Sequence, residues 1–148
     1  VVAKLLLQAL PDVAIFGEKD YQQLQVIRRM ARDLDIPVRI EGGPTVREAD
    51  GLALSSRNAY LTAEERALAP ALHRVLVEVA ARIRHGAPPV QALADAMVVL
   101  ESEGFGPVEY VELRDAETLA PDPAPGRPGR LLAAAWLGKT RLIDNIAV

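Results

Sequence analysis

A strand–helix–strand pattern near the start of the chain constrains the fold most strongly. Residues 12–16 (DVAIF) form a short apolar run typical of a buried strand, and residues 20–35 carry apolar side chains at helical spacing. Pro37 ends that helix, and residues 38–41 are a second strand candidate. Strands joined by one helix run parallel through a right-handed crossover. The pattern therefore predicts a parallel α/β unit, preceded at residues 1–10 by the last turns of a helix.

Gly42, Gly43 and Pro44 mark a boundary in this pattern. Beyond them, long helical periodicities come first and short apolar strands follow, which is typical of an α+β domain with an antiparallel sheet. We therefore expect two domains, residues 1–45 and residues 46–148. The elements expected in the second domain are helices at 62–86 and 90–103 and strands at 108–113, 130–136 and 141–148.

Local signals refine the expected elements of the second domain. Thr62 and Glu65 have the spacing of a capping box, and Pro70 should kink or break the helix that they start. Gly104 is the expected glycine after the second helix, and Gly138-Lys139 suits a tight hairpin. The proline-rich stretch 121–129 is predicted to be a mobile surface loop.

Composition excludes several classes of protein. The formal net charge is −3, and no lysine or arginine cluster is present, which argues against a nucleic-acid-binding surface. There is no cysteine, so disulfides, thiolate nucleophiles and cysteine zinc sites are impossible, which fits a cytoplasmic protein. No apolar stretch approaches the roughly 20 residues that span a bilayer, so we expect no membrane association.

The run GLALSSRN (residues 51–58) holds the best candidate for an anion site. The hydroxyls of Ser55 and Ser56 adjoin the guanidinium of Arg57, and such groups suit phosphate oxygens. A Ser-Ser-Arg segment on a loop is more often simply solvated, so this run alone is weak. It gains weight from two further runs, FGEKDYQQL at 16–24 and PTVREADG at 44–51.

The segment from Gly17 to Asp20 joins a strand end to a helix start. Ligands of parallel α/β sheets bind at the carboxyl ends of strands, so Lys19 could hold a phosphate there. The alternative is a capped turn, in which Asp20 is the N-cap residue and Gln23 its capping-box partner. Spacing alone favours the capped turn.

Other charged and aromatic residues have structural interpretations. Arg47 is expected to pair locally with Glu48 or Asp50, and no full set of metal ligands is present. His73 and His85 are expected at the surface or at helix ends, and Trp136 in the core.

The three runs, in this order and at this spacing, resemble the pantothenate synthetase family, ATP-dependent ligases that join pantoate to β-alanine. The resemblance returns at EYVELRDAETL (109–119) and RLIDNI (141–146). It implies that residues 1–45 are the terminal part of a Rossmann-like nucleotide-binding domain and that residues 46–148 are a lid domain. Family members begin with a half that carries an H-x-G-H motif. Because this chain starts at Val1 and lacks that motif, we expect a C-terminal portion of such an enzyme.

The resemblance also implies roles for individual residues. Lys19, Ser55, Ser56 and Arg57 are carried over as the catalytic residues that hold ATP phosphates. The other implied contacts are Gly17 and Asp20 at the ribose, Val46 and Leu54 at the nucleotide, and Gln23 at pantoate. Leu54 stands where relatives often carry methionine, a change of similar volume that should matter little.

The reaction implied is the condensation of pantoate with β-alanine through a pantoyl adenylate, which gives pantothenate, AMP and pyrophosphate. ATP is a substrate, Mg²⁺ arrives with the nucleotide, and no metal site of the protein is expected. The isolated chain should be inactive and should self-associate as a homodimer, because its short parallel sheet would be left uncovered. The alternative is a non-catalytic nucleotide-binding or interaction module with the lid fold.

Overall fold

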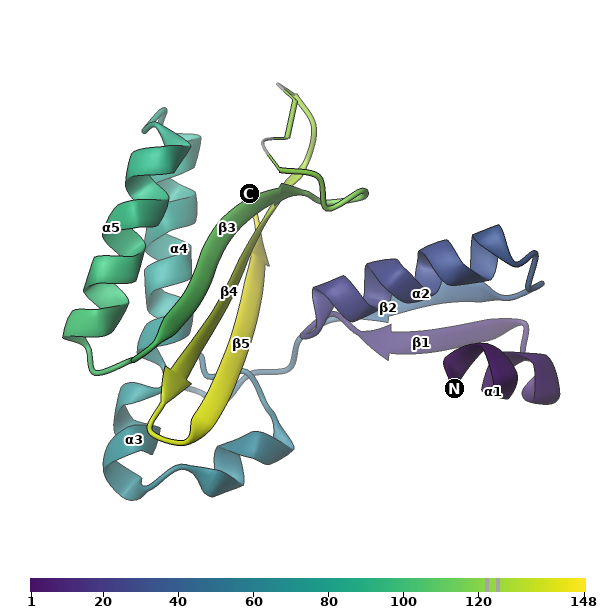
Figure 1. Ribbon diagram of the computed structural model, residues 1–148, viewed down its shortest axis with the longest axis horizontal. Coiled ribbons are helices and arrows are strands. Elements are labelled where there is room, and N and C mark those ends of the chain that lie inside the picture. Colours follow the sequence, from purple (N-terminus) through teal and green to yellow (C-terminus); the bar gives the residue numbers. More distant parts are fainter. Residues whose placement is uncertain (122, 125) are drawn as a thin grey trace. The chain divides into compact units, whose positions relative to one another are not determined.

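The computed structural model describes residues 1–121, 123–124 and 126–148, and it divides into two compact units, Val1–Thr45 and Val46–Val148 (Figure 1). The first unit contains a parallel pair of strands, and the second contains a separate three-stranded antiparallel sheet. The expected fold class, a parallel α/β part followed by an α+β part, is therefore confirmed.

The first unit is the strand–helix–strand arrangement that its sequence predicts. Strand pairing begins at Val13 opposite Arg39 and ends at Gly17 opposite Gly43. Gly17 therefore belongs to the first strand, which extends one residue beyond the expected range of 12–16. Gly42 and Gly43 likewise extend the second strand, where residues 38–41 were expected. The elements are α1 (Val2–Ala9), β1 (Val13–Gly17), α2 (Tyr21–Asp33) and β2 (Arg39–Gly43).

Helix α2 starts and packs as its sequence pattern indicates. The carboxylate of Asp20 accepts a hydrogen bond from the backbone amide of Gln23 at 3.1 Å, which satisfies one of the free donors of the first turn. Leu24, Ile27 and Ala31, which recur at helical spacing, form its buried stripe. The helix is thereby fixed with its N-terminus just after β1.

The second unit follows the expected order of helices and then strands. Its sheet has the order β3-β4-β5, and every neighbouring pair is antiparallel (Figure 1). Gly138 and Lys139 form the two-residue turn between Leu137 and Thr140, and Gly138 has φ +57°. The elements are η1 (Ser56–Tyr60), α3 (Ala63–Leu68), α4 (Ala71–Arg84), α5 (Pro89–Ser102), β3 (Val108–Asp115), β4 (Gly129–Leu137) and β5 (Thr140–Ala147).

The helix signals of this unit are also confirmed. The Thr62 hydroxyl accepts from the Glu65 amide at 3.2 Å, and the Glu65 carboxylate accepts from the Thr62 amide at 2.9 Å. Pro70 separates α3 from α4, so it breaks the helix rather than kinking it. Gly104, with φ +96°, follows α5 in the left-handed conformation that favours glycine.

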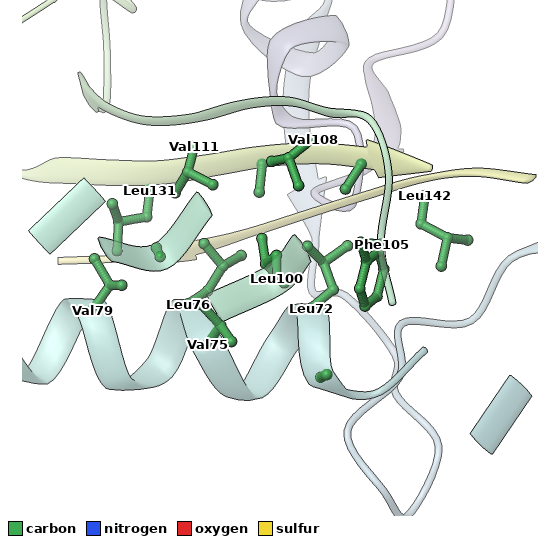
Figure 2. Close-up of a cluster of buried hydrophobic side chains, with 14 of the residues drawn as sticks. Leu72, Val75, Leu76, Val79, Leu100, Phe105, Val108, Val111, Leu131 and Leu142 are labelled. Atoms are coloured by element: carbon green, nitrogen blue, oxygen red, sulfur yellow. The ribbon is translucent and has the colours of Figure 1, made fainter. Parts of the chain in front are cut away.

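The core of the second unit lies between helices α4 and α5 and the sheet (Figure 2). Leu76, Leu100 and Leu131, one from each of α4, α5 and β4, are fully buried there. Trp136 was expected in this core, but it is half-exposed, and its Nε1 donates to Glu109 Oε1 at 2.6 Å. Side chains alternate along β4, so Ala135 and Leu137 occupy the core face and Trp136 takes the other face.

The link between β3 and β4 includes Asp122 and Pro125, so part of the predicted mobile loop lies outside the described residues. Its described flanks are held to strand β3. The amide of Ala116 donates to the carbonyl of Pro128 at 3.0 Å, and Arg127 forms an ion pair with the buried carboxylate of Asp115. This guanidinium, together with hydrogen bonds from Thr118, holds the pKa of Asp115 well below its usual range. Within the described residues, no helix is long and apolar enough to cross a membrane.

Candidate functional site

The first group of expected site residues lies where β1 passes into α2. Gly17 is the last residue of β1, Asp20 caps α2, and Gln23 is in the first turn of α2. The turn between them is tied to the neighbouring strand, because the amide of Glu18 donates to the carbonyl of Gly43 at 2.8 Å. Lys19 thus lies between the carboxyl end of a parallel strand and a helix N-terminus, a position that favours anions.

The second group begins with a short hairpin over residues 46–54. The amide of Leu54 donates to the carbonyl of Val46 at 2.9 Å, which joins the two ends of the hairpin. Gly51, at its tip, has φ +94° and could not carry a side chain without meeting the ring of His73. The hairpin makes Val46 and Leu54 neighbours, and both are exposed.

The SSRN segment (Ser55–Asn58) follows this hairpin directly. Ser55 Oγ accepts from the amide of Arg57 at 3.2 Å, and Asn58 Nδ2 donates to the carbonyl of Ala53 at 3.1 Å. Ser56 and Arg57 are exposed, and within the described part of the chain no carboxylate is paired with Arg57. Two hydroxyls and an uncommitted guanidinium on a braced turn can bind phosphate oxygens.

The partner of Arg47 differs from the one expected. Arg47 pairs with Asp144 of strand β5 rather than with Glu48 or Asp50. Asp50 pairs instead with Arg66 at 2.7 Å, and this hydrogen bond lowers the pKa of Asp50. The prediction of a local ion pair is wrong, because the hairpin points the guanidinium toward β5. Sequence reasoning missed Asp144, although a carboxylate inside the apolar run RLIDNI was a signal that it could have used.

The two histidines occupy different environments. His85 ends α4, and its ring makes a 2.7 Å contact with the carbonyl of Ala81, as expected for a helix-end histidine. His73 is half-buried in the first turn of α4, so it lies at a helix end as expected, but it is not a surface residue. Its Nδ1 lies 3.4 Å from Asp144 Oδ2. Burial, and then the nearby charge of Arg47, lower the pKa of His73, which disfavours the charged form of its ring.

The expected metal chemistry can be compared with the described residues. No three carboxylates or histidines of the described ranges lie close enough together to hold one ion. The expectation that Mg²⁺ enters with the nucleotide phosphates stays a prediction, as do the individual roles of the expected site residues.

Comparison with known proteins places the chain in one family. The family model described as "Pantoate-beta-alanine ligase" matches residues 1–147. Pantothenate synthetases of Paramagnetospirillum magneticum and Caulobacter vibrioides are 64% and 61% identical to it over 100% of the chain. The chain spans about half the length of these curated relatives, namely 52% and 53%.

Solved structures of the same family resemble the fold. Pantothenate synthetase from Thermus thermophilus matches 98% of the chain at a TM-score of 0.87 and 45% identity, and the match covers 52% of that protein. Pantoate-beta-alanine ligase from Francisella tularensis, complexed with beta-gamma ATP and beta-alanine, matches 98% of the chain at a TM-score of 0.72 and 30% identity, over 47% of its own length. The chain belongs to the pantoate–β-alanine ligase family.

Proposed function

We propose that this chain is part of an enzyme that condenses pantoate with β-alanine at the expense of ATP, giving pantothenate, AMP and pyrophosphate. The observation that carries the proposal is the family match over residues 1–147, which includes both the β1–α2 turn and the SSRN segment. The Francisella relative in complex with a nucleotide and β-alanine supports the same choice of substrates.

The proposed chemistry has two steps. A carboxylate oxygen of pantoate attacks the α-phosphorus of ATP, a P–O bond forms, and the bond to the leaving pyrophosphate breaks. The amine of β-alanine then attacks the carbonyl carbon of the pantoyl adenylate, which forms the amide and releases AMP with loss of a proton. Negative charge builds up on the transferring oxygens in the first step, so fixed donors and cations accelerate it.

The expected site residues supply those groups. Lys19 and Arg57 provide positive charge, and Ser55 and Ser56 provide hydroxyl donors to the phosphates. The remaining residues complete the site in this proposal. Gly17 and Asp20 lie at the ribose, backbone near Val46 at the adenine edge, Leu54 at the nucleotide, and Gln23 at pantoate.

The two units have separate roles in this proposal. Val1–Thr45 is the terminal part of a Rossmann-like nucleotide-binding domain, and Val46–Val148 is a lid that brings the SSRN segment to the phosphates. We place the enzyme in the cytoplasm, in keeping with a chain that contains no cysteine. Mg²⁺ would reach the site on the nucleotide, and no step is assigned to it.

Replacement of Arg57 tests the proposed phosphate site in the chain itself. Arg57→Ala should weaken ATP binding about tenfold, because a charge-assisted bond to phosphate is lost. Lys19→Ala should weaken it less, since the SSRN residues are consecutive and need little from the first unit. Binding of wild-type chain should also fall with added salt. Calorimetric titration with ATP at two salt concentrations measures these effects.

Arg84→Ala is the matched control for this titration. Arg84 is an exposed arginine of the same unit at the end of α4, so its removal changes the net charge equally without touching the SSRN segment. ATP affinity should be unchanged in this control. If Arg57→Ala behaves like Arg84→Ala, or if binding does not respond to salt, the SSRN segment is not the phosphate site.

Self-association of the chain as a homodimer is a further expected result. Ile15 of β1 is 70% exposed, and Leu5 and Leu7 of α1 are also exposed. A parallel sheet is normally covered on both faces, so these apolar groups should recruit a second copy. Light scattering at rising concentration should show a species heavier than the monomer. Ile15→Lys should lower the measured mass toward that of the monomer. A strict monomer at high concentration would contradict this expectation.

A further inference from the structure

A buried carboxylate of strand β5 holds the arginine of the 46–54 hairpin. Arg47 Nη1 donates to Asp144 Oδ2 at 2.7 Å, and Nη2 donates to Oδ1 at 2.8 Å. Asp144 is 3% exposed, and the amide of Asn145 also donates to Oδ1, at 2.7 Å. A two-pronged pair fixes the orientation of the guanidinium as well as its distance. Arg47 is therefore held rigidly against the sheet.

Hydrogen bonds continue from Arg47 into the SSRN segment. Arg47 Nη1 also donates to the carbonyl of Gly51 at 3.0 Å, and the backbone of Arg47 bridges that of Ala53 across the hairpin. The carbonyl of Ala53 in turn accepts from Asn58 Nδ2 at 3.1 Å. An unbroken series of contacts thus leads from the Asp144 carboxylate to the end of the SSRN segment.

His73 lies beside both Gly51 and the Asp144 carboxylate. Its ring lies against Gly51, and its Nδ1 is 3.4 Å from Asp144 Oδ2, farther than the two nitrogens of Arg47 at 2.7 and 2.8 Å. Burial also lowers the pKa of His73, which disfavours a charged ring beside the carboxylate. Arg47 consequently remains the cation that neutralises Asp144.

We infer that Asp144, acting through Arg47, is a positioning residue that holds the SSRN segment in the conformation that binds phosphate. This inference rests on the proposed function, in which that segment takes the phosphates of the nucleotide. Asp144 touches no substrate itself. Its role is to keep Ser55, Ser56 and Arg57 pre-ordered, so that little conformational entropy is lost on binding.

Asp115 is a matched control for Asp144, because it is a buried carboxylate whose ion pair has only a structural role. Its side chain is 5% exposed, against 3% for Asp144, and it is also paired with an arginine, Arg127. Its carboxylate accepts hydrogen bonds from Glu117, Thr118 and Arg127, and among the residues that the structure describes no partner belongs to the hairpin or to the SSRN segment. Asp115→Asn should therefore reduce stability without altering the phosphate site, whereas Asp144→Asn should affect both.

The first measurement is the affinity of the chain for inorganic pyrophosphate, by calorimetry at a temperature where every variant is folded. Asp144→Asn should weaken binding about tenfold, and Asp115→Asn should leave it unchanged. Arg47→Lys keeps the charge but loses the fork, so it should weaken binding by a smaller factor. Arg47 is partly exposed, which makes this second variant the safer one for folding.

The second measurement needs no ligand. Backbone ¹⁵N relaxation should show lower order parameters for residues 55–58 in Asp144→Asn and Arg47→Lys, but not in Asp115→Asn. If order and affinity stay at wild-type values in both pair variants, or fall equally in Asp115→Asn, the positioning role is wrong. If wild type binds no pyrophosphate, or Arg57→Ala binds it as well as wild type does, the proposed function fails, and the order parameters still decide the positioning role.

Discussion

The 148-residue chain alone is expected to produce no measurable pantothenate from ATP, pantoate and β-alanine. It spans about half the length of its curated relatives. Groups that act as a unit in catalysis lose most of their effect when one member is missing. The SSRN segment is proposed to bind the phosphates of ATP without help from the missing part, so we expect this chain to bind ATP but not to turn it over. That separation is the signature of a partial active site.

An assay for AMP tests this expectation. The chain is incubated with the three substrates, and a full-length relative such as the Caulobacter enzyme serves as the positive control. The preparation should come from a host that lacks its own enzyme, and Arg57→Ala should be run beside wild type. Turnover by wild type that disappears in Arg57→Ala would show that the chain is sufficient for catalysis and would overturn the expectation.

Leu76→Ala is expected to destabilise the second unit by about 3 kcal/mol. Leu76 is fully buried on α4, within the cluster that α4 and α5 form with the sheet (Figure 2). Removal of its side chain loses buried apolar contacts and leaves a cavity that the two helices and the sheet cannot fill completely. The first unit has its own small cluster around Leu6, Ala31 and Ile36, so it should not respond.

Urea denaturation, monitored by circular dichroism, measures the loss of stability. NMR spectra of the backbone amides then show whether the affected residues belong to the second unit. Val77→Ala on the same helix is the control, because Val77 is 47% exposed and its loss should change stability by no more than about 0.5 kcal/mol. Equal effects of Leu76→Ala and Val77→Ala would mean that α4 does not bury the face assigned to it.

Helix ends and turns could be predicted from the sequence because they depend on residues only a few positions apart. Asp20 and Thr62 cap helices through partners three residues away, and Pro70 and Gly138 impose breaks through their own backbone preferences. The parallel and antiparallel sheets followed from apolar periodicity in the same way. The motif runs led to the family, which the match over residues 1–147 then established. The roles of Lys19, Gln23 and the SSRN residues stay predictions.

The tertiary structure alone decided which distant groups meet. Arg47 has acidic neighbours in sequence, yet its partner is Asp144, 97 residues away, because the hairpin turns the guanidinium toward β5. His73 is half-buried for the same reason, since α4 lays it beside Asp144. Trp136 is apolar enough for a core, but the register of β4 turns it to the opposite face. Composition and periodicity specify whether each element is a helix or a strand. The long-range pairs depend on how these elements pack against one another, and no short stretch of sequence contains that information.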